Sequence, residues 1–166
     1  WDGGRLPTEA EWEYTARYLA LPELPPSKMV MPGRRFPWGA EQVYCSANYQ
    51  EPDCASSRAR SPADTQYGTW SVDHDSYTTA WQRVYHLAGN VAEWTADVST
   101  AYGVGCWAPN ASRADPLCAA PGSTLRMTAR GGGYNSLRWE VRGAARQGVD
   151  PSERDRARGF RCVRTP

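Results

Sequence analysis

The chain has 166 residues, a length that favours a single domain, and 19 basic against 18 acidic side chains leave a net charge of +1. This balance gives no global field to attract nucleic acid or an anionic membrane surface, so neither partner is expected. No apolar run approaches the roughly 20 residues of a membrane-spanning helix, so this segment is not expected to insert into a membrane. Eight Trp, nine Tyr, 15 Gly and 13 Pro predict a compact fold with modest regular secondary structure.

The clearest helix signal lies in residues 5–20, RLPTEAEWEYTARYLA. Thr8 followed three residues later by Glu11 is a capping box, which satisfies free N–H groups of the first helical turn. Three apolar residues then recur at near-helical spacing and should face the core: Trp12, Ala16 and Leu19.

The next stretch, residues 22–41, is studded with prolines and glycines and predicts an extended loop. Phe36 and Trp38 are expected to anchor it by packing. Residues 48–82 are polar and irregular, without a convincing period.

Strands are expected in the second half of the chain. Residues 83–98 alternate around a Gly89-Asn90 turn and predict a short strand, a turn and a half-buried segment. Another strand is predicted through Leu125, Met127 and Ala129, ending at three glycines. A final strand over residues 159–165 should place Phe160, Cys162 and Arg164 on one face.

Four of the five cysteines form two short-range couples, Cys45 with Cys54 and Cys106 with Cys118. Each couple closes a loop-like stretch, where a disulfide could tie an otherwise costly loop. Free buried thiols are the main alternative, and zinc is disfavoured because neither His74 nor His86 has ligand spacing to a cysteine. Bridges would indicate an oxidising, extracytoplasmic compartment: secreted, periplasmic or cell-surface. Cys162 is left over.

Four sequence islands occur in a defined order: RLPTEAEWEY, FPWGAE with ANY, LAGNVAEW, and RGGGY with GFRC. Together they make residues 4–162 resemble the formylglycine-generating-enzyme-like (sulfatase-modifying factor) domain. The resemblance implies an α+β fold, a C-type-lectin-like variant with low regular secondary structure and long loops. Because such domains ordinarily start upstream of the first island, residues 1–166 are expected to be one domain that lacks its N-terminal portion.

The resemblance also bears on catalysis. The best-known enzymes of this family oxidise a sulfatase cysteine to formylglycine with copper held by two thiolates, one of them shortly after the Arg-Gly-Gly segment. Here Ser136 stands at that position, and the chain reaches residues 144–146 too soon to contain the second thiol. A serine hydroxyl is a hard ligand that cannot hold Cu(I) as a thiolate does. No catalytic residue and no copper are therefore predicted.

The resemblance further implies two structural calcium sites built from oxygen ligands. The first would use Asn90, Val91 and Glu93, and the second Asn48, Tyr49 and Asp73. For the first site the alternative is that Asn90 takes a left-handed turn conformation while Glu93 pairs with an arginine. For the second, the alternative is a solvated acidic loop.

Four residues are expected to surround the groove in which the family receives its peptide: Tyr134, Ser136, Arg138 and Trp139. The many arginines near the C-terminus are otherwise interpreted as surface and half-buried ion pairs. The predicted function is a non-catalytic module of a larger extracytoplasmic protein, which binds a protein or peptide partner. The alternative is a metal-dependent oxidase or formylglycine-generating enzyme acting on a sulfatase-type peptide. Carbohydrate binding is a third hypothesis, which rests on analogy of fold.

Overall fold

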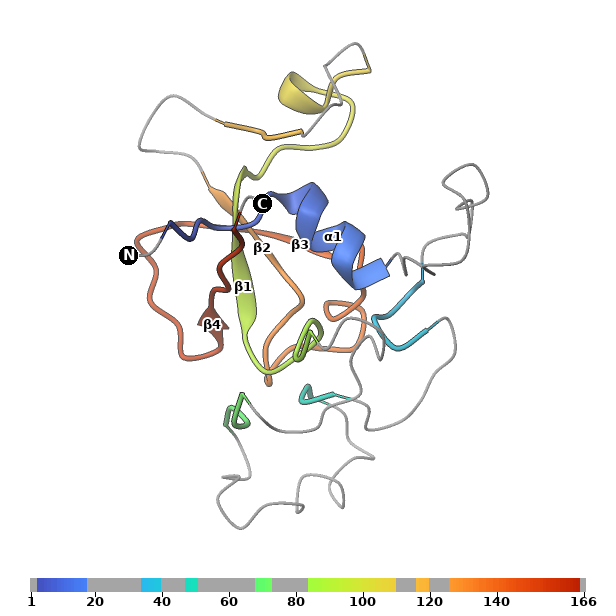
Figure 1. The fold of residues 1–166 in the computed structure, drawn as a ribbon, viewed down its shortest axis with the longest axis vertical. Helices are drawn as coiled ribbons and strands as arrows, with labels where there is room; N and C mark the ends of the chain where they lie inside the picture. Colours follow the sequence, from blue (N-terminus) through green and yellow to red (C-terminus); the bar gives the residue numbers. More distant parts are fainter. Residues whose placement is uncertain are drawn as a thin grey trace.

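The computed structural model describes residues 3–17, 34–39, 47–50, 68–72, 84–109, 116–119 and 126–164. Within them, one α-helix, α1 (Glu9–Arg17), packs against a four-stranded sheet with strand order β3-β2-β1-β4 (Figure 1). The remaining elements are β1 (Ala92–Val98), β2 (Met127–Arg130), β3 (Arg146–Val149), β4 (Arg158–Gly159) and a short 3-10 helix, η4 (Gly105–Trp107). The fold is α+β, as predicted, with much irregular backbone.

The sheet is mixed. Strand β1 pairs antiparallel with β2, β2 pairs antiparallel with β3, and β1 pairs parallel with the two-residue β4. The register of β1 against β2 shifts between Trp94 and Val98, which marks a bulge in the central strand. The turn expected at Gly89 and Asn90 is confirmed, but the order of the elements around it is wrong: no strand covers residues 84–91, and the strand follows the turn, beginning at Ala92.

The capping box at the start of α1 is confirmed. The Thr8 N–H donates to Glu11 Oε2 at 2.8 Å, and the Glu11 N–H donates to Thr8 Oγ1 at 3.1 Å. Asp97 of β1 adds a second anchor by accepting the Glu9 N–H at 2.5 Å. Trp12 and Ala16 are buried as expected, whereas Leu19 lies outside the described residues.

Three apolar clusters of the described residues form the core. One surrounds Phe36, whose ring stacks on Trp38 with centroids 4.9 Å apart, so both predicted loop anchors are confirmed. The second joins Trp12 and Ala16 of α1 to Leu87. The third packs the sheet through Ala92, Ala129 and Val149.

The predicted final strand is wrong in its extent, whereas the shared face of Phe160, Cys162 and Arg164 is confirmed, since all three are exposed and alternate with the half-buried Arg161 and Val163. Strand β4 covers only Arg158–Gly159, and Val163 makes an isolated antiparallel bridge with Arg5. Phe160 is 59% exposed and Cys162 is also exposed, whereas Arg161 turns inward to the carboxylate of Glu93. The buried ion pair, and not the apolar ring, sets which face of this segment points inward.

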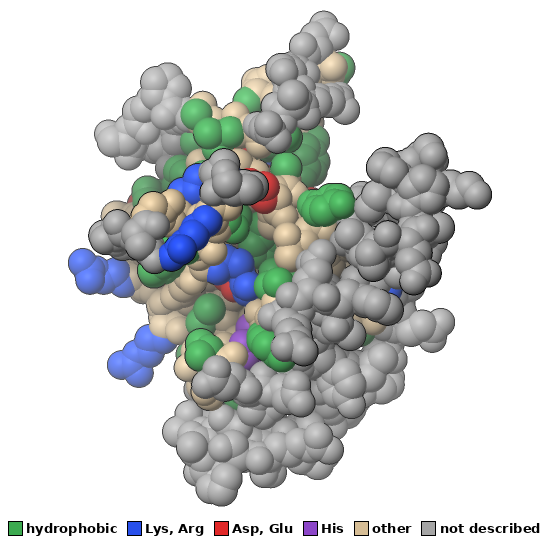
Figure 2. All heavy atoms as spheres, viewed as in Figure 1, with side chains coloured by type: hydrophobic (Ala, Val, Ile, Leu, Met, Phe, Trp, Pro, Cys, Tyr) green, Lys and Arg blue, Asp and Glu red, His purple; other side chains and the backbone are tan. Residues whose placement is uncertain are grey.

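Surface arginines of the described residues pair with acidic side chains, as the near-equal numbers of basic and acidic residues led us to expect. On the face shown in Figure 2, basic side chains project mainly at one edge of the described region. Arg158 is typical, since it lies 3.6 Å from Asp155 and 3.8 Å from Glu153 while its guanidinium covers the ring of Trp94 at 5.2 Å. No helix among the described residues has the length and apolar character required to cross a membrane.

Candidate functional site

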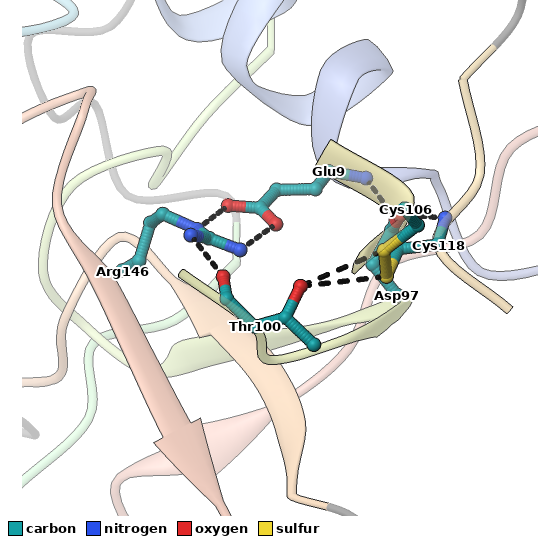
Figure 3. The surroundings of a disulfide bond; sticks show 6 residues. All are labelled: Glu9, Asp97, Thr100, Cys106, Cys118 and Arg146. Carbon is teal, nitrogen blue, oxygen red and sulfur yellow. Dashed lines mark hydrogen bonds and ion pairs between the residues drawn. A yellow bond between two sulfur atoms is a disulfide. The ribbon is translucent and has the colours of Figure 1, made fainter. Parts of the chain in front are cut away.

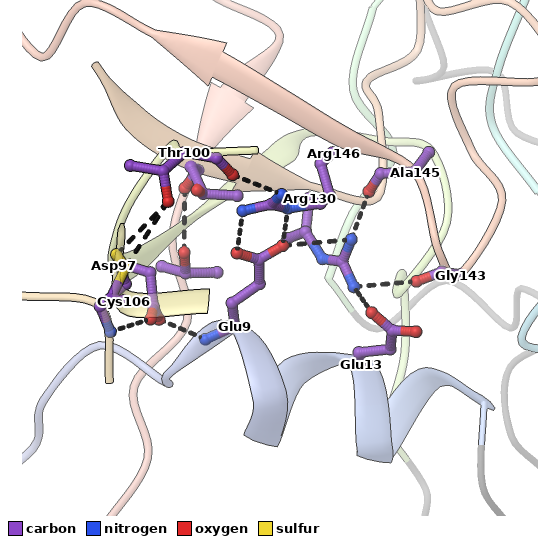
Figure 4. A network of polar contacts seen from close by, with 12 residues as sticks. Glu9, Glu13, Asp97, Thr100, Cys106, Arg130, Gly143, Ala145 and Arg146 are labelled. Atoms are coloured by element: carbon purple, nitrogen blue, oxygen red, sulfur yellow. Dashed lines mark hydrogen bonds and ion pairs between the residues drawn. A yellow bond between two sulfur atoms is a disulfide. The ribbon is translucent and has the colours of Figure 1, made fainter. Parts of the chain in front are cut away.

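A buried ion cluster, defined as Glu9, Glu13, Arg130 and Arg146, joins α1 to the sheet (Figure 4). Arg130 ends β2 and is 1% exposed. Its guanidinium donates to Glu13, lies 3.5 Å from Glu9, and donates to the Ala145 carbonyl at 2.7 Å. A guanidinium can be buried at this depth because carboxylates and carbonyl oxygens replace its water.

Arg146 at the start of β3 completes this cluster. Its Nε and Nη2 atoms form a bidentate pair with Glu9, and its Nη1 donates to the Thr100 carbonyl at 2.8 Å. Burial acts to lower the pKa of Arg146, but hydrogen bonding and the charge of Glu9 outweigh it, so the pKa is raised. The arginine is therefore a fixed cation.

Glu93, a predicted calcium ligand on β1, is 4% exposed and has partners on both carboxylate oxygens. The Trp12 Nε1–H donates to Oε2 at 2.7 Å, and Arg161 forms a bidentate pair with Oε1 and Oε2. A calcium ion at this carboxylate would meet the guanidinium charge of Arg161. The contacts of Glu93 therefore match the arginine-paired alternative more closely than a calcium ligand set.

The two predicted calcium elements nevertheless meet. The Asn90 N–H donates to the Asn48 carbonyl at 2.7 Å, and Asn48 Nδ2 lies 3.4 Å from Asn90 Oδ1. Asn90 has a φ of 66°, the left-handed conformation of the alternative interpretation, and its Oδ1 also accepts the Trp70 N–H at 2.7 Å. Tyr49 is buried, Val91 is half-buried, and Asp73 lies outside the described residues.

Gly89 makes this approach possible. Its φ is 75°, and a Cβ there would lie 2.2 Å from the carbonyl oxygen of Asn48. Its N–H donates to the Gly131 carbonyl at 2.8 Å, so the LAGN turn rests on the RGGG turn. Only glycine fits a position with both a positive φ and such a close neighbour.

Ser136, which the resemblance places at the family's catalytic position, closes a turn. Its N–H donates to the Gly133 carbonyl at 3.0 Å, and its hydroxyl accepts the Gly133 N–H at 3.1 Å. Gly132 lies so near that a Cβ there would be 3.1 Å from the Ser136 hydroxyl. The side chain therefore supports the backbone of the glycine turn.

A pocket of about 310 Å³, here called the Ser136 pocket, opens beside this turn. Its described lining is Ala129, Gly131, Gly132, Ser136, Trp139, Glu140, Arg142, Ala144, Ala145, Arg146 and Gln147. Ser136 and Trp139, two of the four predicted groove residues, are in it. The Tyr134 N–H instead donates to the Asn90 carbonyl at 2.9 Å, and the Arg138 guanidinium lies 5.8 Å from the centroid of the Phe36 ring.

Sequence reasoning missed Glu140 and Arg142 of this lining. The Glu140 carboxylate accepts the Leu137 N–H at 2.6 Å, and Arg142 Nε donates to the Trp139 carbonyl at 2.9 Å. Neither contact has a local sequence signal. The glycines of the lining could have been anticipated, because residues without side chains leave room for a ligand.

The disulfide between Cys106 and Cys118 is confirmed, with Cα atoms 5.4 Å apart (Figure 3). It ties η4 to residues 116–119, and the Cys118 N–H donates to Asp97 of β1 at 2.6 Å. Cys162 is free and exposed, as expected. Cys45 and Cys54 lie outside the described residues.

Comparison with known proteins gives a consistent result. A family model described as the sulfatase-modifying factor enzyme 1-like domain matches residues 1–166. The chain is 33% identical to a formylglycine-generating enzyme of Thermomonospora curvata, over 100% of this chain and 51% of that protein. It is 32% identical to the enzyme of the same name from Streptomyces coelicolor, over 98% of this chain and 47% of that protein.

Other similar proteins carry different names. The chain is 29% identical to the serine/threonine-protein kinase Pkn1 of Chlamydia trachomatis, over 99% of this chain and 22% of that protein. Among solved structures, Treponema denticola variable protein 1 matches with a TM-score of 0.64 and 23% identity, over 96% of this chain and 46% of that one. The last similarity shows a shared fold. The chain spans about half, or less, of each of these proteins.

Proposed function

Since the chain belongs to the family of sulfatase-modifying factor enzyme 1-like domains, we propose that it is a non-catalytic member, which binds a protein or peptide partner in the Ser136 pocket. The observation that carries this proposal is the hydrogen bond from the Gly133 N–H to the Ser136 hydroxyl. In this proposal Ser136, at the position where the catalytic enzymes have a thiol, stabilises the glycine turn. The pocket beside that turn is retained.

The chemistry of Ser136 supports a role without catalysis. A serine becomes a nucleophile when an adjacent base removes its proton. The described lining of the pocket contains no histidine or lysine to act as that base, and no cysteine to bind Cu(I). Both routes to covalent or oxidative chemistry at this position are therefore unsupported.

The lining supports peptide recognition. Trp139 is 59% exposed, and exposed Trp and Arg side chains are the usual anchors of peptide and protein partners. Arg142 and Glu140 give the rim one group of each charge. A pocket of this volume suits one or two side chains of a bound segment.

A random peptide library displayed on phage would test the binding role. We expect the chain to enrich peptides whose affinity falls at least tenfold in Trp139→Ala, because loss of an aromatic anchor removes a large share of the binding energy. Arg126→Ala is the matched control, since Arg126 is exposed but lies outside the pocket, and it should bind as the wild type does. Equal binding by Trp139→Ala would refute the proposed site.

A second experiment addresses catalysis directly. The chain is titrated with copper under reducing conditions and incubated with a sulfatase-motif peptide, and the peptide is analysed by mass spectrometry. No formylglycine is expected. Formylglycine as a product would establish the alternative, a formylglycine-generating enzyme, and end the non-catalytic proposal.

The wider setting is also part of the proposal. The Cys106–Cys118 bridge supports an oxidising compartment, and therefore an extracytoplasmic protein. The relatives named above are about twice as long as the chain or longer, which supports a module within a larger protein. A mixed sheet with one helix and long irregular segments is also compatible with a C-type-lectin-like variant of the α+β class.

Calcium is the cofactor that the resemblance implies, and the residues fit it unevenly. The side chains of Asn48 and Asn90 adjoin, with Asn90 Oδ1 accepting the neutral Trp70 N–H, whereas the Glu93 carboxylate is paired with the cationic Arg161 and accepts the Trp12 N–H. A structural calcium ion would therefore be held mainly at Asn48 and Asn90. An unfolding temperature that rises with added calcium, and not with magnesium, would support it, and no rise would refute it.

A further inference from the structure

A second pocket lies away from Ser136, between α1 and the loop that carries η4. It has a volume of about 270 Å³, and its described lining is Glu9, Ala10, Glu13, Tyr14, Tyr102 and Trp107. We call it the Tyr102 pocket. Its described lining has no residue in common with that of the Ser136 pocket, so the two pockets can be tested independently.

The two carboxylates of this lining are already neutralised by arginines. Glu9 forms a bidentate pair with Arg146 and lies 3.5 Å from Arg130 (Figure 4). Glu13 accepts a hydrogen bond from Arg17 on one oxygen and from Arg130 on the other. Because guanidinium groups already balance both negative charges, the pocket favours a neutral occupant over a charged one.

Two aromatic rings of the lining form an open corner. The rings of Tyr102 and Trp107 meet edge to face, with centroids 6.0 Å apart and an interplanar angle of 67°. Tyr102 is 61% exposed, so aromatic surface is available to a partner. A compact apolar ring that enters the corner contacts both aromatic side chains at once.

Both rings are held in place before a partner binds. The Arg146 guanidinium lies 4.3 Å from the centroid of the Tyr102 ring and supports one of its faces. Trp107 follows Cys106 of the disulfide, and the Trp107 N–H donates to the Val104 carbonyl at 3.0 Å. A preformed surface of this kind reduces the entropy that is lost on binding.

The polar side chains of the lining suit carbonyl groups better than N–H groups. Burial and the charge of Glu9 raise the pKa of Tyr102, so its phenol keeps its proton at neutral pH and can donate it. The carboxylates of Glu9 and Glu13, by contrast, already accept hydrogen bonds from guanidinium groups. A bound segment that brings carbonyl oxygens and few N–H groups therefore leaves the fewest polar groups unpaired.

We propose that the Tyr102 pocket binds a proline-rich segment of a protein partner in the polyproline II conformation. Proline has no backbone N–H, and in this conformation the carbonyls are free to accept a hydrogen bond from the Tyr102 hydroxyl. The pyrrolidine ring is compact and apolar and occupies the corner between Tyr102 and Trp107. Such a segment is already ordered, so it loses little entropy on binding. The proposal does not depend on the function of the Ser136 pocket.

Nuclear magnetic resonance of the whole ¹⁵N-labelled chain tests this assignment, with acetyl-hexaproline amide as the probe. The indole signal of Trp107, identified by its loss in Trp107→Phe, should shift in a saturable way. A capped hexapeptide of alternating alanine and serine should bind roughly fivefold more weakly or worse, because it brings N–H groups and no ring. Capped hexalysine should also bind roughly fivefold more weakly or worse, because the carboxylates of the lining are already paired. All three affinities are measured on the wild-type chain, so the comparison does not depend on a variant folding.

Variants add the location. Tyr102→Leu should weaken the proline probe about tenfold, because it removes one aromatic wall. Tyr102→Phe keeps the ring but lacks the hydroxyl donor and should weaken it about threefold. Trp139→Leu in the Ser136 pocket should leave the affinity unchanged. No saturable shift with hexaproline, or equal affinity for either control peptide, would overturn the proline-rich partner. Wild-type affinity in Tyr102→Leu, or loss of binding in Trp139→Leu, would overturn the location.

Discussion

The buried ion cluster and the Ser136 pocket are neighbours that share Arg146 but differ in how their side chains are used. In the cluster, Glu9 and Arg130 have partners supplied by other parts of the chain, and both are almost fully buried. In the pocket, Trp139 turns its ring to solvent. Glu9 and Arg130 belong to two of the four sequence islands that carry the resemblance, so the resemblance rests partly on residues that hold the scaffold and does not require a thiol at Ser136. The predictions below test this division, from the largest expected effect to the smallest.

The first prediction concerns the cluster itself. Arg130→Met should lower the free energy of unfolding by about 3–5 kcal/mol, because the buried Glu9 and the half-buried Glu13 each lose a guanidinium partner. Arg126→Met is the matched control, since Arg126 lies just before the same strand but is exposed, and it should cost less than about 1 kcal/mol. Urea unfolding monitored by fluorescence measures both. Equal losses of unfolding free energy in Arg130→Met and Arg126→Met would show that the buried ion cluster does not stabilise the fold more than a surface arginine does.

The second prediction separates two glycines with positive φ. Gly103→Ala should cost about 1–2 kcal/mol, because its φ is 88° but no atom lies within 4 Å of the added Cβ. Gly89→Ala should cost roughly 3 kcal/mol or more, because a collision with the Asn48 carbonyl adds to the same backbone strain. Thermal unfolding of the two variants gives the comparison. If Gly89→Ala were no worse than Gly103→Ala, the packing of the two turns would be looser than described.

The third prediction compares two residues of one loop, Ser136, which should stabilise the fold, and Trp139, which should bind the partner. Ser136→Ala should lower the free energy of unfolding by about 1 kcal/mol, because the Gly133 N–H loses its acceptor. Trp139→Ala, three residues away, should change stability by less than about 0.5 kcal/mol while it weakens peptide binding. Denaturant titration and peptide binding are measured on the same samples. If Ser136→Ala weakened peptide binding without lowering stability, Ser136 would belong to the binding surface and not to the scaffold.

The smallest loss of stability is expected at the exposed ion pair between Arg5 and Glu11. Hydrogen bonds from Arg5, assisted by the Thr8 N–H, lower the pKa of Glu11 to about 2. The pairing of ionised Glu11 with Arg5 therefore stabilises the fold fully above pH 4.5, the ordinary pKa of the carboxyl group. This stabilisation is lost as the pH falls through about 2. Because the side chains of Arg5 and Glu11 are each 43% exposed, Glu11→Gln should lower the free energy of unfolding by only a few tenths of a kcal/mol at pH 7. The difference from wild type should shrink towards pH 2, and a difference that grows would contradict the assignment.

Local features of this protein could be predicted from its sequence, and distant pairings could not. The capping box at Thr8, the turn at Gly89 and Asn90, and the strand before the RGGG turn each have signals within a few residues. Arg146 and Glu9 are 137 residues apart, and nothing in either neighbourhood identifies the other as its partner.

The same limit applies to the final segment. The period-two alternation predicted which residues share a face, but not that this face is the exposed one, which follows from the pairing of Arg161 with a carboxylate 68 residues earlier. At the candidate site, resemblance identified Ser136 and Trp139 but not Glu140 or Arg142, whose contacts with the Leu137 N–H and the Trp139 carbonyl are local but lie in an irregular loop without a recognisable sequence pattern. The pocket lined by Tyr14, Tyr102 and Trp107 had no signal in the sequence, because its lining comes from two segments that are far apart in the chain.

The edges of the sheet have a consequence for how the chain behaves at high concentration. An open strand edge invites a second molecule to add its own strand, which is a common start of aggregation. Here β4 offers two residues, and β3 offers four, of which the Gly148 carbonyl already accepts two hydrogen bonds from Arg126. With so few free backbone groups on these two strands, edge-to-edge pairing of copies through β3 or β4 is disfavoured.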